Sequence, residues 1–223
     1  MMLYPDAKIM IFAKAPEAGQ SKTRLIPAMG EEAAAELHKR MAQYIIDNML
    51  TARIADIELH CYPDCQHAFF LRQPGLHNIT LHKQQGRHLG ERMANAMMKA
   101  LTQSRYAIII GTDAPCLTPG YLLTAFEKLK SGTDVVIGPA EDGGYVLIGL
   151  SQYNPLLFEN IDWGSEHVLQ QTLDRIKESN MSLHILDMKW DVDTVNDLSK
   201  LRHNNQLSFL LNNLEIQHEP KTA

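Results

Sequence analysis

Asp113 is the residue of this sequence that is best placed to do chemistry. It follows the apolar run 107–110, which is typical of a strand covered on both faces. Gly111 lets the chain turn, and Pro115 prevents a helix from starting at once. A carboxylate at such a place needs a cation or hydrogen-bond donors nearby. Because ligands bind at the carboxyl ends of strands in open α/β sheets, we interpret Asp113 as a ligand of a divalent metal or as a turn carboxylate.

Two cations follow the first predicted strand. The apolar run 8–14 leads into the loop 15–24, which contains proline, glycine and serine and ends with Lys22 and Arg24. Backbone N–H groups of such a loop can face a phosphate, whose charge the two cations can neutralise. The glycine and lysine spacing of a P-loop is absent. The loop is therefore either a phosphate cradle or an ordinary solvated loop.

A pair of acids lies in another loop between two apolar strands. Glu141 and Asp142 are followed by Gly143, Gly144 and Tyr145. The glycines let a substrate approach the backbone, and either acid can accept a proton from a hydroxyl group. The same stretch also predicts a β-hairpin, which explains these residues without any function.

More acids follow the last predicted strand, at 182–188. Asp191 and Asp193 lie beyond its end and have no structural explanation, whereas Thr194 and Asp197 have the spacing of a capping box. The loop with Lys22 and Arg24 and the turn at Asp113 both follow apolar strands, so they should lie at one edge of the sheet. Cations from one loop and carboxylates from others would meet there, as a metal-bound nucleotide requires.

The elements that position these residues alternate between strands and helices through most of the chain. Helices are predicted from residue 30 to about 53, from the stretch after 84 to 101, from 118 to 132 and from 166 to about 178. This alternation predicts an α/β fold with a largely parallel sheet. With 223 residues and no internal repeat or long linker, we expect one domain over 1–223. We expect the polar tail after about residue 211 to be partly disordered.

Composition excludes several classes of protein. The net charge of -5 gives no electrostatic reason to expect nucleic acid or an anionic membrane as a partner. No segment approaches the ~20 apolar residues of a membrane span, and no signal peptide is recognisable. The three cysteines, Cys61, Cys65 and Cys116, lack zinc-site spacing. We expect a cytoplasmic protein with reduced thiols.

Five motifs in this chain together resemble one known family. They occupy residues 12–25, 89–93, 111–115, 138–145 and 191–194. In this order they are similar to the bacterial GT-A-like glycosyltransferases of the DUF2064 type, within the nucleotide-diphospho-sugar transferase superfamily. That superfamily includes molybdenum-cofactor guanylyltransferase and phospholactate guanylyltransferase. The resemblance covers residues 8 to 202, with one departure: His88 stands where the family pattern has Asp, at a position concerned with base or ribose recognition.

The resemblance implies a three-layer α/β/α sandwich with a mixed, mostly parallel sheet. It implies that a nucleotide is bound by Ala13, Lys14, Ala15, Pro16, Gly19, Lys22, Thr23, Arg24, Gln85, Arg92 and Thr112. It implies that Mg²⁺ or Mn²⁺ is held by Asp113, Asp191 and Asp193. The sugar or acceptor side would consist of Gly143, Gly144, Tyr145 and Trp163, with Asp142 or Glu141 as the catalytic base.

Three functions follow from these residues. The first is glycosyl transfer from a nucleotide-diphospho-sugar to a small acceptor. The second is nucleotidyl transfer from a nucleoside triphosphate to a phosphorylated small molecule, although the glycine-rich loop usual for that reaction is absent and Gly19 stands nearly alone. The third is nucleotide binding without turnover, against which the retained acids argue. The sequence predicts no oligomeric state.

Overall fold

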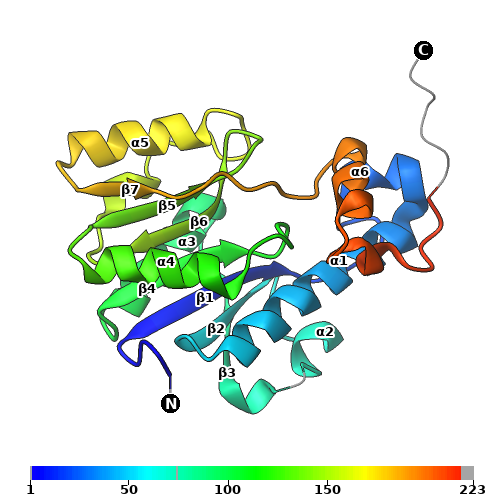
Figure 1. The fold of residues 1–223 in the computed structure, drawn as a ribbon, viewed down its shortest axis with the longest axis horizontal. Helices are drawn as coiled ribbons and strands as arrows, with labels where there is room; N and C mark the ends of the chain where they lie inside the picture. The colour runs from blue at the N-terminus through cyan, green and yellow to red at the C-terminus, as the bar shows by residue number, and fades with distance from the viewer. Residues whose placement is uncertain (1, 74, 217–223) are drawn as a thin grey trace.

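The computed structural model describes residues 2–73 and 75–216. Within these residues seven strands form one sheet in the order β3-β2-β1-β4-β6-β5-β7 (Figure 1). The strands are β1 (Ala7–Lys14), β2 (Asp56–Tyr62), β3 (Ile79–Lys83), β4 (Tyr106–Gly111), β5 (Val135–Pro139), β6 (Tyr145–Leu150) and β7 (Leu183–Ile185). Strand β6 is antiparallel to β4 and β5, and the other pairings are parallel. The predicted mixed, mostly parallel sheet is therefore confirmed.

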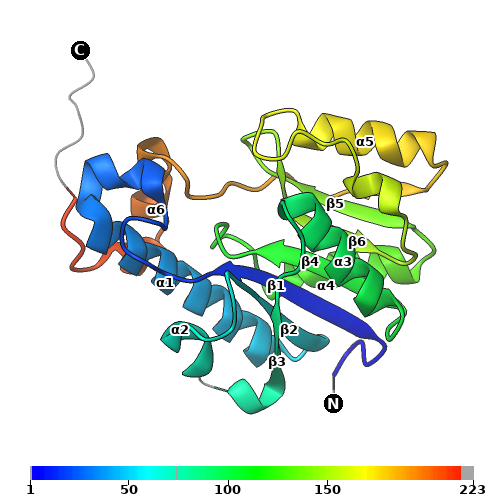
Figure 2. The same ribbon diagram turned by 180° about the vertical axis from the view of Figure 1, so that it is seen from behind.

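Helices cover both faces of the sheet. One face packs against α1 (Ile26–Ala52), α2 (Ala68–Leu71) and α4 (Pro119–Lys130), and the other against α3 (Leu89–Leu101) and α5 (Val168–Glu178) (Figures 1 and 2). The remaining helical elements are α6 (Val195–His203), η1 (Thr23–Leu25), η2 (Leu76–Asn78), η3 (Pro155–Phe158) and η4 (Ser208–Leu211). The predicted three-layer α/β/α architecture is confirmed.

Strand β1 shows how the sequence fixes these layers. Its neighbours on both sides are parallel strands, so all its backbone groups are paired and both faces are covered. Because side chains alternate along a strand, Ile9 and Ile11 enter the core beneath α1 and α4, whereas Met10 and Phe12 enter the core beneath α3. The unbroken apolar run in the sequence follows from this double burial.

Helix α1 starts earlier than the sequence predicts. It begins at Ile26, and Gly30 interrupts it with φ 77° and ψ 167°, a backbone that favours glycine. The segment before Gly30 leaves the sheet and packs with α6 and η4 (Figure 1). This third core contains Leu25, Met29, Ala34, Leu37, Met41, Val192, Leu198, Leu201, Leu207 and Leu210.

Residues 186–194, which we call the crossing segment, connect β7 to α6 and appear orange in Figures 1 and 2. The segment is held against the ends of other strands by backbone hydrogen bonds. Lys189 N–H donates to the carbonyl of Pro139 (2.9 Å), and Val192 N–H donates to the carbonyl of Asp113 (2.9 Å). It therefore carries Asp191 and Asp193 to the end of β4.

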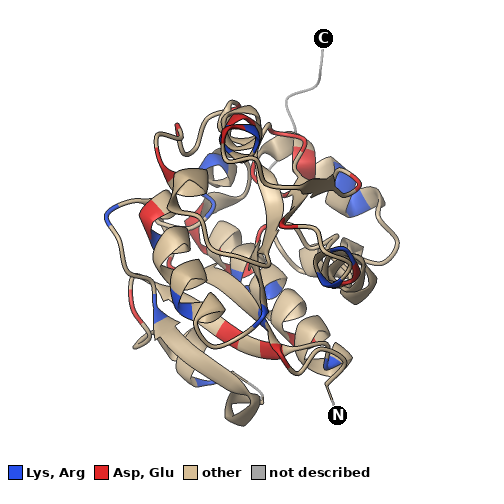
Figure 3. Ribbon diagram, turned by 90° about the vertical axis from the view of Figure 1, so that its left-hand side faces the viewer, with Lys and Arg blue, Asp and Glu red and all other residues tan. Residues whose placement is uncertain are grey.

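The end of the described chain is packed rather than loose. Leu214 and Ile216 contact the third core, and Arg40 donates a hydrogen bond to the carbonyl of Asn212 (2.6 Å). The tail after about residue 211, predicted to be partly disordered, is therefore packed over 212–216, and its remaining part, 217–223, lies outside the described residues. Basic and acidic residues are interspersed over the elements (Figure 3). Among the described helices, none is both long and apolar enough for a membrane crossing.

Candidate functional site

A cavity of about 590 Å³ opens at the carboxyl ends of β1 and β4. Its walls come from these strands, from the start of β6, from α3, from the loop before α5 and from the crossing segment. The strand order reverses here, because β1 connects outward to β2 and β4 connects outward to β5. Such a switch point is the usual ligand site of an open α/β sheet.

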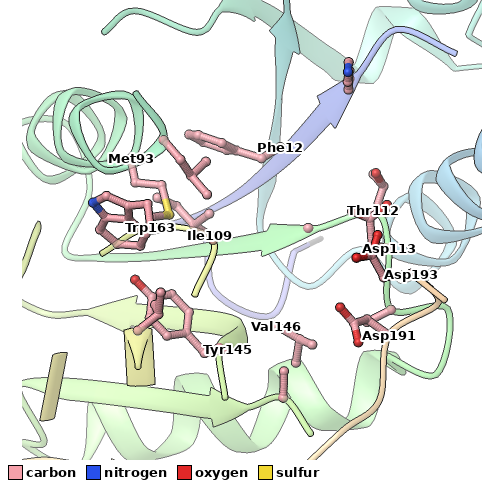
Figure 4. A pocket seen from close by; sticks show the side chains of 18 of the residues that line it. Phe12, Met93, Ile109, Thr112, Asp113, Tyr145, Val146, Trp163, Asp191 and Asp193 are labelled. Atoms are coloured by element: carbon pink, nitrogen blue, oxygen red, sulfur yellow. The ribbon is translucent and has the colours of Figure 1, made fainter. Parts of the chain in front are cut away.

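Cations and carboxylates from three segments meet at one end of this cavity, where Figure 4 shows the carboxylates of Asp113, Asp191 and Asp193. The ammonium of Lys22 lies 2.9 Å from Asp113 Oδ1 and 3.7 Å from Asp193 Oδ1. Arg24 Nη1 lies 2.5 Å from Asp193 Oδ2. The residues predicted to bind metal and phosphate therefore lie together. Lys22, which was predicted to bind phosphate, instead contacts the carboxylates of Asp113 and Asp193.

His38 belongs to the same group, although it was not among the predicted site residues. Its Nε2 lies 3.0 Å from the carbonyl oxygen of Lys14, which can only accept, so Nε2 carries the proton. Its Nδ1 lies 3.5 Å from Asp113 Oδ1. Burial tends to raise the pKa of Asp113, but Lys22 and His38 outweigh it and hold that pKa well below its usual range.

Asp191 lies in the same cavity with the opposite shift. Burial, together with the negative charges of Asp142 and Asp113, raises the pKa of Asp191 to about 6, and Lys22 opposes this only in part. A carboxyl group with a pKa near neutrality can take up and release a proton under ordinary conditions. Asp191 is therefore the acid whose environment best suits proton transfer.

The two adjacent acids of the hairpin are separated by the turn. Residues 140–144 form the predicted turn between β5 and β6, and Asp142 Oδ1 accepts the N–H of Gly144 (2.9 Å). Asp142 lines the cavity. Glu141 instead pairs with Lys200 of α6 at 2.5 Å and is not part of the cavity wall. Of the two predicted catalytic acids, only Asp142 has access to a ligand there.

The other end of the cavity is aromatic and apolar. Trp163 and Tyr145 meet edge to face, with ring centroids 6.4 Å apart, and Met93 lies beside them (Figure 4). The indole also packs against Gly90, where a Cβ would lie 2.1 Å from Trp163 Nε1. Only glycine leaves room for this contact, which explains the glycine of the 89–93 motif.

A third group lies beyond the ends of β2 and β3. The guanidinium of Arg92 stacks on the Tyr62 ring, 4.3 Å from its centroid. Gln84 donates to the carbonyl of His60 (2.8 Å) and lines the cavity, whereas the predicted Gln85 is exposed and does not. Tyr62 ends β2 and Gln84 follows β3 at the ligand-binding edge of the sheet, a signal that could have identified both.

The structure brings most of the predicted site residues to this one cavity. Those that line it are Ala13, Lys14, Arg24, Arg92, Thr112, Asp113, Asp142, Gly144, Tyr145, Trp163, Asp191 and Asp193. The predicted residues that are not part of its wall are Ala15, Pro16, Gly19, Lys22, Thr23, Gln85, Glu141 and Gly143.

The donor set suits a hard divalent cation only in part. Among the residues that the structure describes, no three His, Cys, Asp or Glu side chains are arranged to hold a metal ion by themselves. Asp113 is half exposed toward the cavity and has Asp191 as a neighbouring carboxylate. Because Mg²⁺ and Mn²⁺ often combine one or two carboxylates with phosphate oxygens and water, these residues fit an ion completed by a phosphate ligand.

Comparison with known proteins identifies the family. The profile of DUF2064, described as "Uncharacterized protein conserved in bacteria", matches residues 45–165. The chain is a DUF2064 protein. No curated protein matched it. The DUF2064 chain is 32% identical to a solved protein of Desulfovibrio desulfuricans G20 with the provisional name nucleotide-diphospho-sugar transferase, at a TM-score of 0.84 over 92% of this chain and 90% of that one.

Two more distant structures share the fold with this DUF2064 protein. One is 4-diphosphocytidyl-2C-methyl-D-erythritol synthase from Anaerococcus prevotii DSM 20548, at 12% identity and a TM-score of 0.54 over 86% of this chain and 94% of that one. The other is Rv0371c from Mycobacterium tuberculosis H37Rv in complex with manganese, at 14% identity and a TM-score of 0.53 over 88% of this chain and 97% of that one.

Proposed function

We propose that this DUF2064 protein is a metal-dependent transferase that uses a nucleotide-activated donor. One observation carries the proposal: a single cavity combines exposed cations, a paired carboxylate and an acid whose pKa is raised to about 6. Sites that push the pKa values of neighbouring acids apart are typical of acid–base chemistry. The name of the similar Desulfovibrio protein supports a nucleotide-diphospho-sugar as the donor.

The diphosphate of the donor would lie beside Lys14 and Arg24. Arg24 is 67% exposed, and both residues line the cavity. The base would lie toward Tyr62, Gln84 and Arg92, where an aromatic ring and a guanidinium offer a stacking surface. The two groups are adjacent along the same edge of the sheet, as the two parts of one nucleotide require.

Asp113 would hold Mg²⁺ or Mn²⁺ together with phosphate oxygens and water, and the ion would stabilise negative charge on the leaving diphosphate. Arg24 contributes a second positive charge at the same place. Thr112, next to Asp113, is buried at the edge of the cavity. The side chains therefore orient the donor and balance its charge, while the phosphate oxygens of the donor complete the coordination of the metal ion.

We further propose glycosyl transfer to a hydroxyl group of a small acceptor. The acceptor would extend from the aromatic end of the cavity, bounded by Tyr145 and Trp163, toward Asp142 and Asp191, which line the same cavity. Asp191, ionised above about pH 6, would accept the proton of the attacking hydroxyl. Two acids at this position repel a phosphate, which disfavours the phosphorylated acceptor that nucleotidyl transfer requires.

Nucleotidyl transfer remains the second candidate, because a synthase that makes a diphosphocytidyl product shares the fold. The two reactions use the same donor cations and metal, and they differ in their products. Glycosyl transfer releases a nucleoside diphosphate, whereas nucleotidyl transfer releases pyrophosphate.

A two-stage experiment tests the proposal. The first stage is a thermal-shift screen of nucleotides and nucleotide sugars with and without Mn²⁺, because a selective ligand raises apparent stability. We expect a nucleotide sugar to stabilise the protein only with metal, and Asp113→Asn to lose this effect. The second stage identifies the released product with the donor that binds. Stabilisation by no nucleotide at all would contradict the proposal, and release of pyrophosphate would favour the second candidate.

A further inference from the structure

Lys22 is placed behind the carboxylates rather than on the cavity wall. Its side chain is 4% exposed, and its ammonium contacts Asp113 and Asp193 at 2.9 and 3.7 Å. Its backbone has φ 50° and ψ 45°, the left-handed region that residues with side chains rarely adopt. Such a backbone persists where the surrounding structure requires it. The ammonium is thus a fixed part of the site and not a mobile surface charge.

Asp113 therefore has one enclosed oxygen and one open oxygen. Oδ1 faces Lys22 and His38 and is fully buried, while the side chain as a whole is 50% exposed. The exposed part of the carboxyl group is consequently on the Oδ2 side, toward the cavity. Any ion that binds there does so opposite an ammonium on the same carboxylate.

We propose that Lys22 is a fixed counter-ion that prevents Asp113 from holding a divalent cation until a nucleotide diphosphate is bound. A carboxylate whose charge is already balanced attracts a second cation weakly, and the two positive charges repel each other. This inference rests on the proposed function for the role of the diphosphate. It changes the role of Lys22, which the sequence assigned to phosphate binding, to that of a positioning residue.

A bound diphosphate adds negative charge on the cavity side of Asp113, opposite Lys22. It brings negative charge next to Arg24 and Lys14, and its oxygens complete the coordination that the described side chains cannot complete alone. Metal and diphosphate then favour each other's binding, and this coupling has the same size in both directions. The structure thereby avoids a metal held without its substrate.

Mn²⁺ alone provides the first test. Its affinity is measured by electron paramagnetic resonance of the free ion for the wild-type protein, Lys22→Met and the control Lys177→Met, which removes the same charge from an exposed position at the far end of α5. We expect Lys22→Met to bind Mn²⁺ about tenfold more tightly, because the repelling ammonium is gone. We expect the control to match the wild type. A folded Lys22→Met protein with unchanged or weaker Mn²⁺ affinity overturns the proposal.

The wild-type protein provides a second test, which decides even if Lys22→Met does not fold. Mn²⁺ affinity is measured without nucleotide and with saturating UDP or GDP. With the nucleotide that binds, we expect about tenfold tighter Mn²⁺ binding, after correction for Mn²⁺ bound by free nucleotide. Equal Mn²⁺ affinity in both conditions overturns the proposal. If no nucleoside diphosphate of any base binds at any Mn²⁺ concentration, the proposed function fails, and the Mn²⁺ affinity of Lys22→Met without nucleotide decides the role of Lys22.

Discussion

Asp113 and Asp191 face the same cavity, but their surroundings are opposite. Asp113 follows β4 and has Lys22 and His38 behind it, which keep its pKa low despite burial. Asp191 comes from the crossing segment, where burial and the negative charge of Asp142 raise its pKa to about 6. The difference shows that residue type alone does not define a role. The paired carboxylate suits a permanent charge, whereas the raised one suits proton transfer.

The largest effect is expected from Asp113→Asn. The change removes the permanent negative charge of the site, and we expect the transfer rate to fall by about 10³-fold or more. The variant also leaves the buried ammonium of Lys22 without its main partner. Since half of the Asp113 side chain is exposed, we expect a loss of about 2 kcal/mol of unfolding free energy, below the value for a fully buried pair. Rate assays measure the fall in transfer rate, and urea unfolding measures the loss of unfolding free energy. A variant with both values unchanged would contradict the role of Asp113 as a permanent charge.

Asp191→Asn should lower activity and raise stability. Loss of a general base typically costs about 10²- to 10⁴-fold in rate. The wild-type rate should fall as the pH drops through about 6, because Asp191 becomes protonated, and the variant should lack this step. The folded-state pKa is raised, so ionisation of Asp191 destabilises the fold as the pH rises from the usual Asp range through about 6.

At pH 8 we therefore expect Asp191→Asn to gain about 1–2 kcal/mol of unfolding free energy. The measurement is urea unfolding at pH 8 beside a pH–rate profile. A destabilised variant that keeps the wild-type pH step would contradict the assignment.

Glu58 offers a paired carboxylate outside the cavity as a reference for Asp113. It is buried beside Lys8, to which it is hydrogen-bonded, and lies 3.1 Å from His60 and 3.7 Å from His82. Burial would raise its pKa, but His60 and Lys8 lower it to about 2. Because the folded-state pKa is depressed, the stabilisation is complete above the unfolded value of about 4.3 and disappears as the pH falls toward 2.

We expect Glu58→Gln to lose on the order of 3 kcal/mol of unfolding free energy at pH 7 and about half as much at pH 3. Guanidinium unfolding at the two pH values measures this difference. Nucleotide and Mn²⁺ affinity should not change. A loss that is equal at both pH values would mean that charge pairing is not the cause.

The smallest effect is expected from the two hairpin acids. Asp142→Asn removes a negative neighbour of Asp191 and should move the pH step to lower pH by about half a unit. Glu141→Gln is the matched control, because Glu141 pairs with Lys200 and points away from the cavity. In Glu141→Gln, the fall of the transfer rate at low pH should occur at the same pH as in the wild type. Equal shifts in both variants would break the distinction between the two acids.

The sequence predicted the fold well because local patterns and burial agree. The apolar run of β1, the capped start of α4 at Thr118 and the capping box of Thr194 and Asp197 are all found in the structure. The start of α1 was predicted at Gly30, four residues after the start at Ile26 in the structure. Packing of residues 26–29 against α6 could not be seen in local sequence.

The site was predicted in part. Residues in motifs that follow strands, such as Asp113 and Asp193, reach the cavity as expected because the carboxyl ends of parallel strands meet at one edge. His38 escaped notice because it lies in the apolar stripe of a helix, between Leu37 and Met41. The direction in which a side chain points could not be predicted from the sequence either. Lys22 and Glu141 point to ion-pair partners that lie far away in sequence.

The most direct test of the central claim is an NMR titration of the carboxyl carbons in protein labelled with ¹³C at aspartate. Asp113→Asn and Asp191→Asn assign the two signals. We predict that Asp191 titrates near pH 6, while Asp113 is still ionised at pH 3. Titration of both carboxyl groups together near pH 4, the ordinary range for aspartate, would contradict the division of roles between them.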